Sequence, residues 1–370
     1  MAKLGMPTIT IAFKEKGIEA VGRNKRGILA VVLEDSAEAV GKLKANPFKI
    51  FTVDDIPADL SADNQDLLVK SLIGYTNAPY RVKVWVQETA EPSENRWDAT
   101  LKLLSGERWD YLVIPSIDGS ELEKVGTWMK TQRDNNNKRS KIILPGYKGD
   151  YEGIINFSNT SIVTKSKTYT GAQYTARIGG LICGTPLTIA CTYAPLPEVL
   201  DVDRHDRDEN AEKVNDGELF IFYDGEKCKL SRGINSLVTT TQGKLEAYQT
   251  IKSVDIMDMV YDDLHDTIED YYVGKYTNDY DNKMLLCSAI LGYLRTLESE
   301  RLLQKGMSTV ELNLEAIKNW ALSNAKYSQE ELAGMSDYEA MNIDTKKHVF
   351  LKINAVILDA MEDFDLDFAI

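Results

Sequence analysis

The side chains that most often carry chemistry are sparse in this sequence and lie far apart. The three histidines, His205, His265 and His348, stand in three distant regions, so a metal site or a catalytic triad would have to gather them from across the chain. A solvated helix face explains His265, and a strand boundary explains His348. No GxSxG nucleophile turn is present. The histidines therefore do not predict an active site.

Phosphate and metal motifs are also missing. The closest approach to a phosphate loop, Gly179 to Gly184, has the wrong spacing, and close packing of a helix explains its glycines better. The acidic group Asp201 to Glu209 lacks the glycine and the closing glutamate of a calcium loop. Cys183, Cys191, Cys228 and Cys287 form no CxxC pair, so we interpret them as buried thiols. We expect no catalytic residue, no cofactor and no metal.

Composition narrows the class of protein further. The chain has 370 residues, of which 43% are hydrophobic, so two or three domains are expected. Its formal net charge of −14 argues against nucleic acid as a direct partner, because binding to phosphates depends on Lys and Arg. No apolar run approaches the roughly 20 residues that span a bilayer. We therefore expect a protein that is made in the cytoplasm and does not insert into a membrane.

The first half of the chain alternates apolar strands with helices. Such alternation favours α/β units with a largely parallel sheet. A segment rich in small residues, from Gly171 to Gly180, is typical of a closely packed helix. The predicted strands are Gly27 to Leu33, Val82 to Val86, Tyr111 to Ile114 and Lys141 to Leu144, with helices starting near Glu94 and Ser120.

The second half favours a hairpin and then helices. Leu219 to Tyr223 and Lys227 to Leu230 flank Asp224-Gly225, a favoured type I′ turn pair. The helices that follow are amphipathic. In the first we expect the apolar stripe to be buried and the acids to lie on the opposite face; the stripes are Met257, Val260, Leu264 and Ile268, then Leu286, Ile290, Leu294 and Leu297, then Leu314, Ile317, Trp320 and Ala321.

Both ends of the chain carry strand patterns. Near the N-terminus Ile9, Ile11 and Phe13 alternate with polar or small residues, and at the C-terminus Phe364, Leu366, Phe368 and Ile370 alternate with Asp363, Asp365, Asp367 and Ala369. His348 to Leu358 is also strand-like. A lone strand with an apolar face is not stable in water, so each terminal strand needs a sheet. The pattern leaves two outcomes open, closure within the subunit or donation to the edge of a neighbouring subunit.

With these motifs in view, the chain resembles contractile tail sheath proteins, in the short form found in phages and phage-like particles of Gram-positive bacteria, including phage-derived R-type bacteriocins such as diffocin. The resemblance covers nearly the whole length. The segments that carry it are GMPTITIAFKEKG, RGILAVVLED, CGTPLTIACTYAPLPEV, SRGINSLVTTTQGKLEAYQTIKSVDIMDMVYDDL, DYYVGKYTNDYDNKMLLCSAILGYLRTLE and VFLKINAVILDAMEDFDL. One departure is Met6-Pro7-Thr8-Ile9, where many sheaths have a Pro-Gly-Val-Tyr-type motif.

The resemblance implies a mixed α+β and α/β sheath fold with a central mixed sheet, packed helices and extended terminal strand arms. It divides the chain into an N-terminal arm (1–20), an N-terminal part of the core (21–90), an α/β sheath domain (91–215), a helical-hairpin part (216–345) and a C-terminal strand and arm (346–370). It implies donation of the arms to neighbouring subunits, through Thr8, Ile9, Thr10, Ile11, Phe13, Phe364, Leu366, Phe368 and Ile370.

The function implied is mechanical. Subunits would form a helical tube of stacked rings around an inner tail tube, with baseplate and tail-terminator proteins as further partners, and would contract to drive the tube through a cell envelope. Lys318 and Lys326 are candidate tube contacts. The particle would be a phage tail or a released bacteriocin. Two alternatives remain, an α/β enzyme that binds a nucleotide or sugar, and a tail tube or baseplate component.

Overall fold

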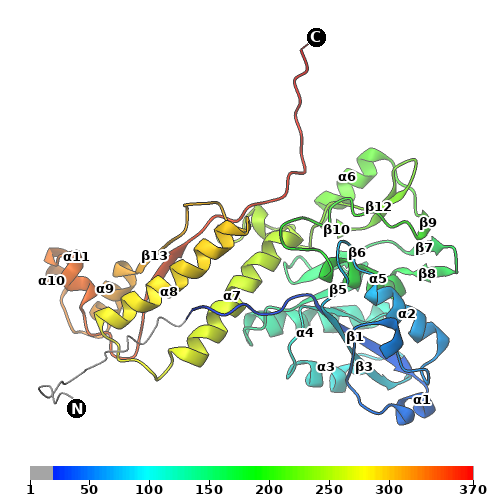
Figure 1. The fold of residues 1–370 in the computed structure, drawn as a ribbon, viewed down its shortest axis with the longest axis horizontal. Coiled ribbons are helices and arrows are strands. Elements are labelled where there is room, and N and C mark those ends of the chain that lie inside the picture. The colour runs from blue at the N-terminus through cyan, green and yellow to red at the C-terminus, as the bar shows by residue number, and fades with distance from the viewer. Residues whose placement is uncertain (1–19, 370) are drawn as a thin grey trace, which may run out of the picture. The chain divides into compact units, whose positions relative to one another are not determined.

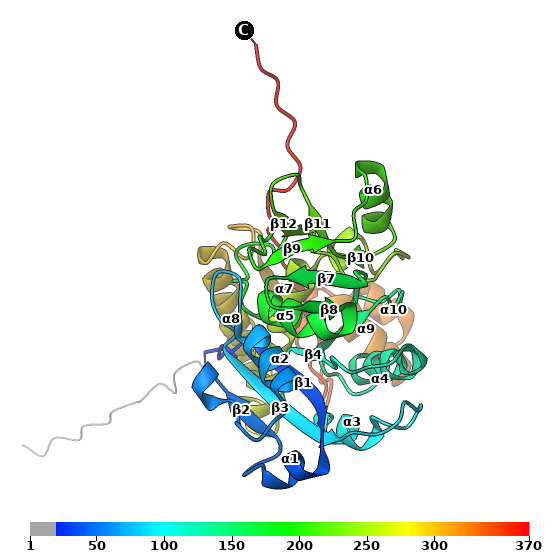
Figure 2. The ribbon, with the colours of Figure 1, turned by 90° about the vertical axis from the view of Figure 1, so that its right-hand side faces the viewer.

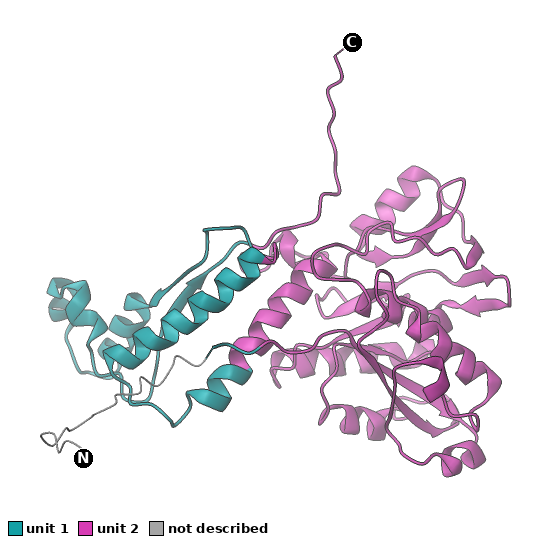
Figure 3. Cartoon of the chain, in the orientation of Figure 1, with its two compact units in different colours: residues 1–22, 266–299, 303–356 teal, residues 23–265, 300–302, 357–370 magenta. Residues whose placement is uncertain are grey.

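The computed structural model describes residues 20–369, and these divide into two compact units (Figure 3). The α/β unit contains residues 23–265, 300–302 and the chain from 357 onward. The helical unit contains residues 266–299 and 303–356, together with the stretch that ends at Gly22. The boundary between the units falls within one long helix, α7 (Ile251–Tyr271). No helix of the described chain is both long and apolar enough to cross a bilayer.

A seven-stranded sheet forms the centre of the α/β unit (Figures 1 and 2). Its strand order is β10-β6-β5-β4-β1-β3-β2, and every pair is parallel except β2 with β3. The largely parallel sheet is confirmed, and it draws strands from 21–90, from 91–215 and, through β10, from 216–345. The strands are β1 (Ile28–Asp35), β2 (Phe48–Ile50), β3 (Arg81–Glu88), β4 (Tyr111–Val113), β5 (Lys141–Pro145), β6 (Ile154–Phe157) and β10 (Glu218–Leu219).

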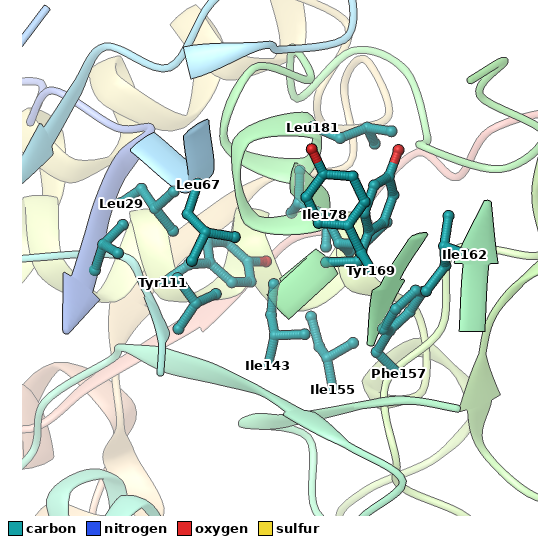
Figure 4. Close-up of a cluster of buried hydrophobic side chains, with 14 of the residues drawn as sticks. Leu29, Leu67, Tyr111, Ile143, Ile155, Phe157, Ile162, Tyr169, Ile178 and Leu181 are labelled. Carbon is teal, nitrogen blue, oxygen red and sulfur yellow. The ribbon is translucent and has the colours of Figure 1, made fainter. Parts of the chain in front are cut away.

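Helices cover both faces of this sheet, which explains the unbroken apolar run of β1. Leu29, Val31 and Leu33 belong to the core that also holds side chains of α2 and α5 (Figure 4), whereas Ile28, Ala30 and Val32 face the core on the side of α3 and α4. The helices of the unit are α1 (Ala37–Lys42), α2 (Ala62–Leu72), α3 (Asp98–Leu104), α4 (Leu122–Asp134), α5 (Gly171–Cys183) and α6 (Arg207–Asn215), with 3-10 turns at Val53–Asp55, Gly119–Glu121 and Glu246–Tyr248.

The glycines of α5 serve helix packing, as predicted. A Cβ atom on Gly180 would lie 2.3 Å from the carbonyl oxygen of Ser71, and one on Gly179 would lie 2.7 Å from a methyl group of Leu29. A side chain at Gly180 would meet backbone that cannot move aside easily, and one at Gly179 would force the Leu29 side chain to shift. The glycines therefore allow α5 to approach α2 and β1 closely, and they do not form a phosphate loop.

Two smaller sheets complete the α/β unit. β8-β7-β9 (Thr168–Thr170, Ser161–Thr164 and Val199–Val202) is antiparallel, and β11 (Ile221–Tyr223) pairs with β12 (Cys228–Leu230). The hairpin was predicted, but its type I′ turn was wrong. Asp224 to Lys227 form a four-residue connection, in which the Asp224 carboxylate accepts from the N–H groups of Glu226 and Lys227. Leu219 belongs to the large sheet instead.

The helical unit is built around α8 (Tyr280–Ser299) and α9 (Leu314–Ser323). The predicted stripe of α8 is buried along its length, as are Ile317 and Ala321 of α9. The predicted strand from His348 to Leu358 is shorter. Toward its end the Val356 carbonyl accepts from the Gln304 N–H and the Leu358 N–H donates to the Leu302 carbonyl, but the regular strand is β14 (Leu351–Asn354) alone. Its partner β13 (Thr309–Leu312) was not predicted, nor were α10 (Gln329–Gly334) and α11 (Asp337–Met341).

The burial predicted for α7 was wrong. Met257, Val260 and Leu264 are only half-buried, whereas Asp258 and Asp263 are 3% and 0% exposed. Asp258 is inside because Lys141 of β5 and Arg133 of α4 pair with it, and Asp263 is paired with Arg23 and accepts from the Asn24 N–H. A buried carboxylate is tolerated where it has such partners.

Candidate assembly surfaces

The C-terminal strand predicted from the sequence is extended and exposed. Phe364, Leu366 and Phe368 are 69%, 83% and 85% exposed, and none of them belongs to a strand within the described residues. Figures 1 and 2 show this segment leaving the α/β unit. Closure onto the subunit's own sheet is therefore not observed for Phe364 to Ala369. Ile370 lies outside the described residues, and so does the predicted N-terminal arm from Thr8 to Phe13.

The residues just before this segment, Leu358 to Asp363, are bound to the α/β unit, and we call them the arm root. The Lys252 ammonium donates to the Leu358 carbonyl, and the Ser253 hydroxyl donates to Asp359 at 2.7 Å. Both donors stand in the first turn of α7, where the helix dipole also favours a carboxylate such as Asp359. The root is thus docked on the N-terminal end of α7.

Two further side chains bind the end of the arm root. The Thr192 hydroxyl donates to Glu362 Oε1 at 2.6 Å. Arg232 Nε lies 2.9 Å from Glu362 Oε2, and its Nη2 donates to Asp363. One guanidinium therefore contacts two successive carboxylates of the tail.

A second candidate assembly surface, the sheet formed by β13 and β14, lies in the helical unit. β13 and β14 pair in register from Thr309 with Asn354 to Leu312 with Leu351, and among residues 20–369 they form a sheet of two strands only. Val310, Leu312 and Leu351 turn one face toward the core of this unit, where α8 and α9 pack. Glu311 and Lys352 are neighbours on the other face. A two-stranded sheet is marginally stable and leaves both outer edges available for pairing.

The outer edge of β14 combines open backbone groups with apolar side chains. The Asn313 N–H donates to the Phe350 carbonyl, so the alternating antiparallel pattern directs the backbone groups of Leu351 and Ile353 away from β13. Val349 and Ile353, on the apolar face, are 44% and 39% exposed. This edge therefore has both the hydrogen-bonding groups and the side chains that an added strand would cover.

A buried ionic network joins α7 to the large sheet. Asp258 contacts Arg133 at 3.0 Å and Lys141 at 2.5 Å, and Lys141 also lies 2.9 Å from Asp255. Burial would raise the pKa of Asp258, but Lys141 and Arg133 outweigh it and hold the pKa below its ordinary value. Burial raises the pKa of Asp255, which Lys141 and the Tyr111 hydroxyl offset only in part. These contacts fix the first half of α7 on the α/β unit.

Chemical reactivity is low where the sequence offered candidates. Burial raises the pKa of the Cys191 thiol to about 12 and that of Cys183 well above its usual range, so neither is an activated nucleophile. A cavity of about 370 Å³ next to Cys183 is lined by Arg26, Asp110 and Asp255, which already pair with other side chains. In the described part of the chain, no group of three or more potential metal ligands gathers at one point.

The candidate tube contacts lie on or just after α9. Lys318 is half-buried in the helix. Lys326 follows it and binds Asp344, through the carbonyl at 2.6 Å and the carboxylate at 3.2 Å. Neither residue is placed against a partner, so their role stays a prediction.

Comparison with known proteins agrees with a structural subunit of this architecture. The phage tail sheath protein central domain matches residues 90–236, and the phage tail sheath C-terminal domain matches residues 244–370. The tail sheath protein of Clostridium phage phiCD119 is 33% identical over 365 residues, which cover 98% of each chain. The chain therefore belongs to the phage tail sheath protein family.

Solved structures of low sequence identity share the fold. The contracted helical sheath of the anti-feeding prophage superposes with a TM-score of 0.69 at 14% identity, over 99% of both chains. The sheath tail protein from Desulfitobacterium hafniense gives 0.67 at 16% identity, over 83% of this chain and 94% of that one. The protein is thus a structural subunit of a contractile sheath and a component of a phage tail or related contractile particle. The enzyme alternative is not supported.

Proposed function

We propose that this chain polymerises helically around an inner tail tube and that contraction of the polymer drives the tube through a target cell envelope. One subunit that carries a donor strand and a different acceptor edge makes heterologous contacts, and such contacts build a helix when they do not close into a ring. A baseplate and a tail terminator would bound the polymer. Assembly would take place in the cytoplasm of the host bacterium, and Lys318 and Lys326 are proposed to face the tube.

The single observation that carries this proposal is that the C-terminal segment and the β13–β14 sheet both lack a partner strand among the described residues. Among residues 20–369, nothing covers the apolar side chains of Phe364, Leu366 and Phe368, and β13 and β14 form a two-stranded antiparallel sheet whose outer edges have no partner strand. Strand addition satisfies both, because main-chain hydrogen bonds complete the edge while alternate side chains extend the apolar face. Hence the arms Thr8 to Phe13 and Phe364 to Ile370 are proposed to pair with the two-stranded β13–β14 sheets of neighbouring subunits.

Charge supports an assignment of each arm to one edge. When apolar faces align, the other face of the C-terminal arm carries Asp365 and Asp367, and these suit Lys352 on β14 better than Glu311 on β13. The corresponding face of the N-terminal arm carries Thr8, Thr10 and Lys14, which suit Glu311. The C-terminal arm is therefore assigned to β14 and the N-terminal arm to β13.

Contraction requires two packings of the same subunits. The extended polymer would be held behind a kinetic barrier, and the contracted polymer would have the lower free energy, so that new contacts between subunits supply the work. The arms would preserve the connection between subunits during the change. No nucleotide is needed in such a mechanism.

Electron microscopy of the purified chain, with light scattering in solution, tests the proposal. The full chain is expected to form hollow striated tubes, and a variant lacking 364–370 is expected to remain a folded monomer. A variant with serine at Phe364 and Phe368 provides a control of unchanged length and is expected to assemble poorly. Ordered tubes from the truncated chain would count against strand donation, and a full chain that stays monomeric at all concentrations would count against the function.

A further inference from the structure

The C-terminal tail changes from bound to exposed over three residues, in which the Asp363 side chain is already 87% exposed. Glu362 is 20% exposed in its side chain and contacts Thr192 and Arg232, whereas Phe364 is 69% exposed. Asp363 lies between them and still pairs with Arg232 through its carboxylate. The end of the arm root is therefore defined by the reach of one arginine.

The backbone that carries Arg232 is held firmly on both sides. The Ser231 N–H donates to the Phe220 carbonyl at 2.7 Å, and the Gly233 carbonyl accepts from the N–H of Ile251 at 2.9 Å. The Gly233 N–H donates to the Thr192 hydroxyl at 2.9 Å, the same hydroxyl that donates to Glu362. Arg232 and Thr192 thus stand on one hydrogen-bonded platform that links β12 to the start of α7.

An arginine suits this position better than a lysine would. Its planar group offers Nε to Glu362 and Nη2 to Asp363, whereas an ammonium is a point charge on a flexible stem. The pKa of Arg232 is raised by its hydrogen bond to Asp363 and by the charges of both carboxylates, despite partial burial. The charged form is therefore the one that binds the tail.

We propose that Arg232 and Thr192 form a clamp that fixes the arm root on the α/β unit and thereby sets the length of chain that a subunit can donate to its neighbour. The inference rests on the proposed strand donation and adds the residues that determine where the donated strand begins. With the clamp closed, the free arm runs from Phe364 to Ile370.

A fixed arm root limits the distance that the free C-terminal arm can span. Seven extended residues span about 25 Å, so the acceptor edge has to lie within that distance of Asp363. Release of the six residues of the root would extend the reach to about 45 Å. A fixed root also removes conformational freedom before assembly, so less freedom is lost when the arm pairs. The clamp therefore favours one neighbour at one distance.

The test compares Arg232→Ala with two other variants of the full chain. Arg232→Lys retains the charge and loses the two-pronged contact of the guanidinium. Arg204→Ala is the control: it removes an arginine of 62% exposure that pairs with Asp201 and lies over the Tyr223 ring, and it makes no contact with the arm root. Three quantities are measured: the protein concentration at which tubes pellet, the rate of chymotrypsin cleavage after Leu358, and the thermal midpoint of unassembled protein. A purely structural role would change the thermal midpoint together with assembly.

For Arg232→Ala we expect about a fivefold higher concentration for assembly, as loss of one well-placed ion pair implies. Cleavage after Leu358 should accelerate several-fold while the thermal midpoint stays within about 2 °C of the original. Arg232→Lys should fall between, and Arg204→Ala should match the original chain. Assembly of Arg232→Ala at the original concentration and with the original cleavage rate would overturn the clamp.

If Arg232→Ala folds badly, an exchange of charge between Arg232 and Glu362 provides a second test of the clamp. Arg232→Glu alone should block assembly, and its combination with Glu362→Arg should recover at least half of it, because the pair is restored with reversed sign. Failure of the combined variant to assemble, with an unchanged thermal midpoint, would overturn the clamp while leaving strand donation in place. A full chain that never forms tubes would overturn the proposed function itself.

Discussion

Replacement of Asp258 by asparagine tests the ionic network beneath the sheet. Asp258 is 3% exposed, and its carboxylate accepts from Arg133 and Lys141, which are 3% and 2% exposed. Asparagine has nearly the same shape but no charge. The buried cations Arg133 and Lys141 would therefore both lose the negative charge of Asp258. Breaking a buried ion pair in this way costs about 3–5 kcal/mol of unfolding free energy.

Asp255→Asn is the matched control on the same helix. Burial raises the pKa of Asp255, which means that its surroundings disfavour the charged form. Asparagine still offers an oxygen to the Tyr111 hydroxyl, which donates to Asp255 at 2.7 Å. We therefore expect Asp255→Asn to lower the unfolding free energy by less than about 1.5 kcal/mol.

Urea unfolding followed by tryptophan fluorescence measures the difference. Trp85, Trp97, Trp109 and Trp128 all lie in the α/β unit, so the signal reports mainly on that unit. With a slope of about 3 kcal/mol per molar urea, Asp258→Asn should lower the midpoint by about 1–1.7 M. Equal shifts for the two variants, or a shift below about 0.3 M for Asp258→Asn, would refute the reasoning.

The pH dependence of the same residue has a defined sign. The pKa of Asp258 is lower in the folded chain than the ordinary value of 3.8. Its contribution to stability is therefore complete above that value and is lost as the pH falls below it toward the folded pKa. The difference in urea midpoint between the original chain and Asp258→Asn should be constant from pH 5 to 7 and should shrink below about pH 3.8.

Three further predictions concern other parts of the fold. Gly180→Ala should lower the unfolding free energy by about 1–3 kcal/mol because its Cβ would meet the Ser71 carbonyl, whereas Gly292→Ala, with open space around it, should raise it by up to about 1 kcal/mol, both measured by urea unfolding. At pH 8, Cys191 should react with iodoacetamide about a thousandfold more slowly than an ordinary thiol, as followed by mass spectrometry, because burial raises its pKa to about 12. Lys352→Glu should raise the concentration needed for tube formation about tenfold and should be rescued by Asp365→Lys with Asp367→Lys, whereas an unaltered concentration would contradict the assignment of the C-terminal arm to β14.

Much of the α/β unit was predictable because its strands are buried on both faces. β1 and β5 form continuous apolar runs that few other elements produce. The short elements of the helical unit were missed, although Ser328 with Glu331 and Ser336 with Glu339 are capping boxes that a closer reading finds. β13 has four residues, of which only Val310 and Leu312 are apolar and Val310 is half-buried, which is too little pattern to predict a strand.

The pattern of α7 predicted that its acids are exposed, but Asp258 and Asp263 are buried, and the reason is physical. Periodicity reports which residues share a face, and it assumes that charged faces meet water. Here Asp258 meets Arg133 and Lys141, which are more than 100 positions away in the chain. The same limit applies to the arm root, because the contact of Glu362 with Thr192 joins residues 170 positions apart. Such partners cannot be found from local sequence.

The alternation of apolar and acidic residues in the C-terminal arm has a consequence for subunits that have not yet assembled. Free chains carry exposed Phe364, Leu366 and Phe368, a composition that invites pairing between identical strands. Two parallel arms in register would place Asp365 and Asp367 beside their own copies, and like charges on neighbouring strands repel. If the arm is donated as proposed, the aspartates would act as gatekeepers against fibre formation, and a subunit would remain in solution with this strand uncovered until it pairs with β14 of a neighbour.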